Sequence, residues 1–142
     1  AQAIALAGPG RVLRVSSSEV IAQRALAGYP HVPGVLTSIR SRRDLHYIAA
    51  YRNDSGVAVC SVPDVLLAES PDPAFYARHE GWLVAGETPS WWSGAAPVPC
   101  DVDAHALLSV ALAALERGED VDAASGLPEY IEGDSPWRGA GP

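Results

Sequence analysis

The chain has 142 residues, which is enough for one domain with its own hydrophobic core. Its formal net charge is −7, so its overall field repels phosphate backbones and argues against direct binding of nucleic acid. Cys60 and Cys100 are too few for a disulfide framework or a four-ligand zinc site, and no apolar run is long enough for a membrane span, so we expect a cytoplasmic chain without membrane contact.

The first predicted elements are a helix end, a short strand and a capped helix. The opening AQAIALAGPG indicates the last turns of an apolar helix, because Gly and Pro cannot continue it. RVLRV is a strand candidate, and a helix then begins after Ser16 as N-cap, with Glu19 closing a capping box and Gly28 ending it. We expect residues 1–28 to be the remnant of a preceding lobe.

Three strands follow, separated by turn residues. GVLTSIR and LHYIAAYR are joined by the charged SRRD, and NDSG leads into VAVCSV, so an antiparallel meander is expected. Alternate residues of the second strand face opposite sides, and both sets are largely apolar, which predicts a sheet covered on both faces. The two sets are Tyr47, Ala49 and Tyr51, and His46, Ile48 and Ala50. Arg42, Arg43 and Asp44 are then a solvated turn.

The second half predicts a short helix, a strand and a longer helix. SPDPAFYARHEG suits a short helix with Pro73 in its first turn and Gly81 after its end, and WLVAGE a buried strand. A Pro/Gly-rich loop, 88–99, precedes an amphipathic helix that Gly118 ends. The apolar side of that helix carries Ala104, Leu107, Leu108, Ala111, Leu112 and Leu115, and the other side His105, Ser109 and Glu116.

Together these elements predict an α/β domain of ribonuclease H-like class. Residues 35–118 would form a lobe with a mixed sheet, a three-stranded antiparallel meander and packing helices, and 119–142 a C-terminal tail.

Candidate chemical groups are sparse. The histidines at 31, 46, 79 and 105 lack the spacing that places two imidazoles on one metal, and capping explains Asp101 and Asp103 better than metal binding. Cys100 precedes a helix start that could acidify its thiol, although an incidental cysteine is favoured. We predict no catalytic, cofactor-binding or metal-binding residue; a small hydrolase using His79, Glu80 or Cys100 is an alternative.

Two adjacent tryptophans, Trp91 and Trp92, stand in the 88–99 loop. With Trp82 they could form a platform for bases, a contact for a partner, or part of the core. The acidic charge argues against bases, and the other two interpretations stay open.

The hairpin VLTSIRSRRDLHYIAAY, 35–51, resembles the second-lobe hairpin of the bacterial tRNA threonylcarbamoyladenosine biosynthesis family TsaB (YeaZ), which runs V-L-x-x-I-D-A-R-x-x-E-V-Y-x-A-x-Y. AQAIALA resembles the family's IAQGLALG helix, and RVSSSEVIAQRAL its GVSTLEALAQ junction. ALLSVALAALERGEDVDAASGLPEYIE resembles the closing helix and P-x-Y-L-R segment. The matching residues are Val35, Leu36, Ile39, Arg42, Tyr47, Ala49, Tyr51, Gly118, Pro128 and Tyr130. Arg40-Ser41 and Glu132 depart from the family's Asp-Ala and arginine.

The resemblance implies an actin-like ATPase fold without its first lobe, whose GPGSFTG-like segment has no counterpart here. It also implies a non-catalytic scaffold that homodimerises and pairs with the catalytic threonylcarbamoyl-transferase subunit and an associated ATPase. These modify the adenine next to the anticodon in tRNA, and a truncated form of the scaffold is expected. Candidate partner-interface residues are Trp91, Trp92 and Tyr130. A stand-alone homodimeric interaction domain is the alternative.

Overall fold

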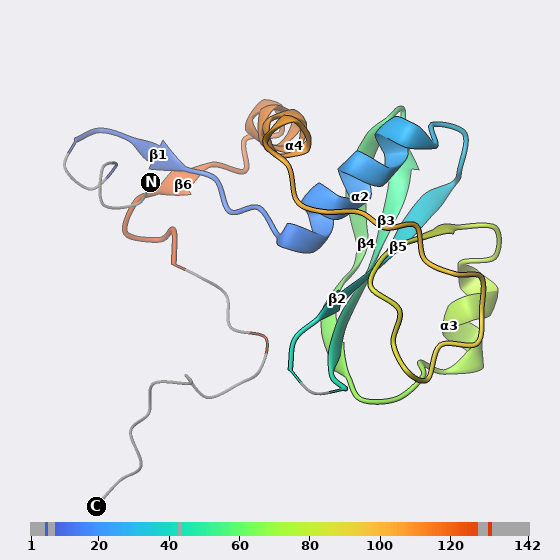
Figure 1. Ribbon diagram of the computed structural model, residues 1–142. Coiled ribbons are helices and arrows are strands. Elements are labelled where there is room, and N and C mark those ends of the chain that lie inside the picture. The colour runs from blue at the N-terminus through green and yellow to red at the C-terminus, as the bar shows by residue number, and fades with distance from the viewer. Residues whose placement is uncertain (1–4, 6–7, 43, 128–130, 132–142) are drawn as a thin grey trace, which may run out of the picture.

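The computed structural model describes residues 5, 8–42, 44–127 and 131 (Figure 1). Its central feature is a four-stranded mixed sheet in the order β4-β3-β2-β5. The meander consists of β2 (Gly34–Arg40), β3 (His46–Asp54) and β4 (Val57–Leu67). β5 (Leu83–Gly86) joins parallel to β2. The predicted α/β class with an antiparallel meander is confirmed.

The β2–β3 hairpin is antiparallel, as predicted. Val35 pairs with Tyr51, and Thr37 with Ala49. Buried residues occur on both faces of β3, with Ala49 and Tyr51 on one and Ile48 and Ala50 on the other. The expectation of a sheet covered on both faces is therefore confirmed.

β4 extends five residues beyond the predicted 57–62 segment, to Leu67, although Pro63 lies within it. β4 is an edge strand, where a missing N–H need not break a ladder on both sides. Its register against β3 also shifts between Ala50 and the residues on either side of it, which is where Pro63 falls. The proline thus sits in an irregular stretch of an edge strand, and the chain continues past it.

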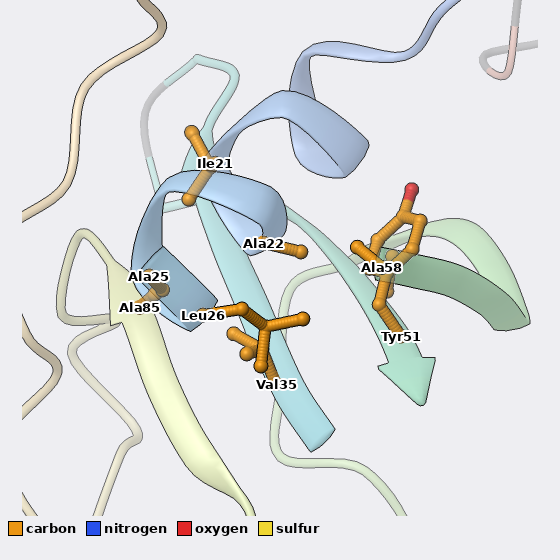
Figure 2. Packing of buried hydrophobic residues seen from close by; sticks show 9 residues of the cluster. Ile21, Ala22, Ala25, Leu26, Val35, Tyr51, Ala58 and Ala85 are labelled. Carbon is orange, nitrogen blue, oxygen red and sulfur yellow. The ribbon is translucent and has the colours of Figure 1, made fainter. Parts of the chain in front are cut away.

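Helix α2 (Ser17–Gly28) covers one face of the sheet. Ser16 caps it by accepting a hydrogen bond from the Ser18 N–H at 3.1 Å, and Glu19 accepts one from the Ser16 backbone, so the predicted capping box is present. Its apolar side chains pack against the sheet (Figure 2). This core comprises Ile21, Ala22, Ala25, Leu26, Val35, Ala49, Tyr51, Ala58 and Ala85. α2 therefore supplies core to the four-stranded lobe, which differs from its expected place in the remnant of a preceding lobe.

Helix α4 (Ala104–Glu116) lies beside α2 (Figure 1). It buries Ala106, Val110 and Ala114. The leucines at 107, 108, 112 and 115 are instead 42 to 56% exposed. The helix was predicted correctly, but the apolar side that its pattern identified is not the side that packs: Ala106, Val110 and Ala114 pack against the protein instead.

The remaining elements lie at the two ends of the sequence. β1 (Arg11–Val12) pairs antiparallel with β6 (Val121–Asp122), outside the four-stranded sheet. β6 therefore brings part of the 119–142 tail beside the first strand. Most of the predicted opening helix lies outside the described residues, of which Ala5 is helical. No helix in the described ranges is long and apolar enough to cross a membrane.

Candidate functional site

The sheet face opposite α2 carries a continuous set of ring contacts, here called the aromatic cluster. It includes rings from helix α3 (Pro73–Arg78), which Asp72 caps through the Ala74 N–H at 2.6 Å. Neighbouring ring centroids lie 4.5 to 6.4 Å apart. In order of contact the members are Trp82, His79, Phe75, Tyr76, Trp92, Trp91 and His46. These rings cover the second apolar face of the sheet.

Gly34 allows the aromatic cluster to approach the sheet. A Cβ at this position would lie 2.5 Å from the Trp82 ring and 2.6 Å from the Tyr51 carbonyl oxygen. The indole therefore lies directly on the β2 backbone. No larger residue fits at Gly34 without moving the ring.

Trp91 and Trp92, two of the predicted interface residues, both belong to the aromatic cluster and are half-buried. Trp92 donates its indole N–H to the Ala95 carbonyl at 2.7 Å. The Trp91 indole N–H is buried and has no acceptor among the described residues. Both rings therefore pack against other rings of the aromatic cluster and also keep part of their surface exposed. The third predicted residue, Tyr130, lies outside the described residues.

A buried serine–histidine pair lies beneath the aromatic cluster. Ser38 Oγ and His46 Nδ1 are 3.1 Å apart, and the residues are 2% and 3% exposed. Burial lowers the pKa of His46, and the nearby Arg40 lowers it further, whereas Glu87 and Asp44 act in the opposite direction. Sequence reasoning missed this pair, because only the hairpin register brings the two residues together.

The distance between Ser38 and His46 suits a nucleophile and its base, but their surroundings do not. A reacting serine must meet a substrate, whereas Ser38 lies within β2 under the aromatic cluster. The Ser38 carbonyl also accepts the Glu87 N–H at 2.8 Å, which fixes the strand at this point. Each of these two buried polar groups gives the other a hydrogen-bond partner, which explains the contact.

The residues of the alternative hydrolase lie in different surroundings. His79 is bonded through Nδ1 to the Phe75 carbonyl at 2.6 Å, and its ring packs against Trp82. Cys100 packs against the core on the α2 side. Burial raises the pKa of the Cys100 thiol, although Arg24 partly opposes this shift, which agrees with the favoured interpretation of an incidental cysteine and not with an acidified thiol. Because His79 and Cys100 belong to opposite faces of the sheet, they do not form a nucleophile–base pair.

A second polar cluster lies at the start of α2. Ser16 Oγ donates to Asp64 at 2.8 Å, and Ser18 Oγ donates to the other carboxylate oxygen of Asp64. The Asp64 carboxylate thereby occupies the positive end of the helix, where an external anion would otherwise be favoured. Burial raises the pKa of both Glu19 and Tyr51 close to this cluster. Asp64 was missed because it follows Pro63, after the predicted strand had ended.

Of the two acids before α4, Asp103 acts as expected for a helix start. Asp103 is the N-cap, accepting the Ala106 N–H at 2.7 Å, and it also pairs with Arg24. The backbone hydrogen bond from Ala106 lowers the pKa of Asp103, and Arg24 adds to this effect. Within the part of the chain that the structure describes, no three acidic, histidine or cysteine side chains gather as metal ligands.

Comparison with solved structures gives a similar protein, whereas no family model and no curated protein matches the chain. One match is an uncharacterised protein from Pseudomonas aeruginosa with similarity to peptidase YeaZ. It is 30% identical at a TM-score of 0.73, with 92% of this chain and 63% of that chain covered. Another is YeaZ from Pseudomonas aeruginosa, 28% identical at a TM-score of 0.68, with 91% and 63% covered.

These matches confirm the resemblance to YeaZ that the hairpin and closing helix indicated. They also confirm the actin-like, ribonuclease H-like fold class. The chain spans less than two thirds of the length of either protein. Over most of its length the chain is therefore similar to part of these two proteins.

Proposed function

We propose that this chain is a non-catalytic scaffold element in the N6-threonylcarbamoyl modification of the tRNA adenine next to the anticodon. The main support for the proposal is the likeness, over 92% of the chain and at 30% identity, to a protein with similarity to YeaZ. Because the chain covers 63% of that protein, the activity and the partners of the whole protein are part of this proposal. The proposed compartment is the cytoplasm.

The chemistry of the described side chains supports a role through association. Ser38 and His46 satisfy each other in the interior, and Asp64 and Asp103 are engaged at helix starts. Burial raises the pKa of the Cys100 thiol, which disfavours its nucleophilic thiolate form. These groups stabilise the fold, although one of the similar structures is described by its likeness to a peptidase.

The proposed partners are the catalytic threonylcarbamoyl-transferase subunit and its associated ATPase. The net charge of −7 supports a protein partner over direct contact with tRNA. Trp91 and Trp92 are the proposed contacts, because half-buried aromatic rings bind partners at little cost in side-chain entropy.

The experiment is co-elution of the chain with the transferase subunit in size-exclusion chromatography, with affinity measured by calorimetry. We expect a complex at concentrations of about 50 µM, which suffice for micromolar affinity. Trp92→Ala should weaken it about tenfold or more. Tyr29→Ala is the matched control, since Tyr29 is 46% exposed and lies outside the aromatic cluster. If the transferase subunit and the chain elute separately at this concentration, the proposal is wrong.

A further inference from the structure

Residues 90–96, here called the tryptophan segment, form a turn over the aromatic cluster between two buried prolines, Pro89 and Pro97. The backbone N–H of Trp92 donates to the Pro89 carbonyl at 3.0 Å, and its indole N–H donates to the Ala95 carbonyl at 2.7 Å. Both hydrogen bonds close the turn on itself. The segment can therefore move as one unit between the two prolines.

Two ring contacts hold the tryptophan segment against the protein. Trp91 contacts His46 with ring centroids 6.4 Å apart, and Trp92 contacts Tyr76 at 5.5 Å. The Trp91 indole N–H is buried and has no acceptor among the described residues, which costs free energy that contact with water would recover. Packing thus holds the segment in place, and one of its own polar groups opposes that packing.

His46 lies under Trp91, where only the neutral imidazole is well accommodated. The residue is 3% exposed, and its Nδ1 lies 3.1 Å from Ser38 Oγ. The neutral ring has one donor and one acceptor nitrogen, whereas the imidazolium has two N–H donors and a full charge. Protonation beneath the tryptophan segment would therefore bury a charge away from water.

Three charged groups act on His46 from outside the aromatic cluster. Arg40 at the end of β2 disfavours the imidazolium, whereas Glu87 after β5 and Asp44 in the hairpin turn favour it. All three side chains belong to exposed residues, so water screens their charges. Burial is the largest influence on the pKa of His46 and keeps the ring neutral at neutral pH.

We propose that the tryptophan segment is a pH-sensitive switch, which moves away from the sheet when His46 takes up a proton. In this open position water reaches both the imidazolium and the Trp91 indole N–H, so both groups favour the movement. At neutral pH the packing of the two half-buried indoles keeps the segment closed. The open position presents Trp91 and Trp92 to solvent, where a partner can reach both rings.

Attraction between the imidazolium and the Trp91 ring would act against opening. Such an attraction is significant when the cation lies within about 6 Å of the ring centroid. The His46 and Trp91 centroids are 6.4 Å apart and the rings are inclined by 77°. Recovery of water by two buried polar groups therefore outweighs this contact.

A single proton sets the size of the effect. The ratio of open to closed segment should change by at most about tenfold per pH unit, because one group binds one proton. The midpoint should lie below the ordinary histidine pKa of about 6.5, since the closed position disfavours protonation.

The test is fluorine NMR of the intact chain labelled with fluorotryptophan, with the signals assigned by single Trp→Phe variants. The change in chemical shift between light and heavy water reports how far water reaches each indole. Between about pH 8 and about pH 5, the range in which histidine titrates, this change should rise for Trp91 and Trp92. It should stay constant for Trp82, whose ring lies on the β2 backbone at Gly34.

Substitution of the histidine separates the switch from other effects of pH. His46→Asn should remove the response of Trp91, because asparagine can keep a hydrogen bond to Ser38 but does not titrate. His105→Asn is the matched control and should keep the response, since His105 is exposed on α4. Circular dichroism checks that each variant stays folded over the pH range.

Two exposed charges test the direction of the effect independently of the buried ring. Arg40→Gln should move the midpoint to higher pH, and Glu87→Gln should move it to lower pH. Constant exposure of Trp91 in the folded chain would overturn the proposal. So would an unchanged response in His46→Asn, or equal midpoints in the two charge variants. Each measurement concerns the isolated chain, so its result does not depend on the proposed tRNA role.

Discussion

Protonation of the buried His46 should destabilise the protein as the pH falls below neutrality. His46 is 3% exposed, and burial lowers the pKa of its imidazole in the folded chain. The unfolded chain binds a proton near the ordinary histidine pKa of about 6.5, whereas the folded chain binds it only at lower pH. In that window the unfolded state holds more protons, so the free energy of unfolding falls as the pH falls.

The magnitude follows from a single titrating group. One group can change the free energy of unfolding by at most about 1.4 kcal/mol per pH unit. The loss by about pH 5.5 is therefore at most on the order of 1 kcal/mol. Burial raises the pKa of Glu19, so Glu19 has the opposite sign: its contribution to stability is present at low pH and is lost as the pH rises through its folded pKa. The contribution of His46 to the pH dependence of stability is therefore isolated by comparing variants.

The assay is urea unfolding at a series of pH values for the unmodified chain and for His46→Asn. Asparagine can keep a hydrogen bond to Ser38 but does not titrate, so the slope below neutrality should largely disappear even if the variant is less stable throughout. His105→Asn is the control, because His105 is exposed on α4. An unchanged slope in His46→Asn would refute the reasoning.

Two further predictions concern the backbone. Gly86→Ala should cost about 2 kcal/mol or more in urea unfolding, because Gly86 has φ +109 and an added Cβ would lie 2.2 Å from the Ser38 carbonyl oxygen. Gly28→Ala, with nothing within 4 Å, should be neutral or slightly stabilising, and equal effects would contradict the steric argument. Asp103→Ala should cost about 1 kcal/mol through loss of the α4 N-cap, whereas Asp101→Ala should stay within about 0.5 kcal/mol. Equal thermal shifts for the two variants would remove the capping argument.

Local signals predicted much of the fold from the sequence. The Ser16 capping box, Pro73 in the first turn of α3 and the period-two strands each follow from short-range chemistry. Longer-range facts were not predictable in this way. The place of α2 in the core depends on its packing against the face of the sheet, and the extension of β4 beyond Pro63 depends on β4 lying at the sheet's edge.

The packing of α4 and the Ser38–His46 pair were also not predictable from local sequence signals. Helical periodicity identified α4, but the helix has a row of small residues as well as a row of leucines, and periodicity does not decide which row packs. Ser38 and His46 are adjacent only through the register of β2 and β3. Burial then makes the pair a structural contact, and spacing in the sequence carries no information on burial.

The most direct test of the central claim measures threonylcarbamoyladenosine by mass spectrometry in a reconstituted reaction. The reaction contains the transferase subunit, the associated ATPase and unmodified tRNA, with this chain as the scaffold component. The account predicts that the modified nucleoside increases with added chain until the chain matches the transferase subunit in amount. It also predicts the same yield with a folded Ser38→Ala variant. A yield that does not depend on the chain, or one abolished by Ser38→Ala, would contradict it.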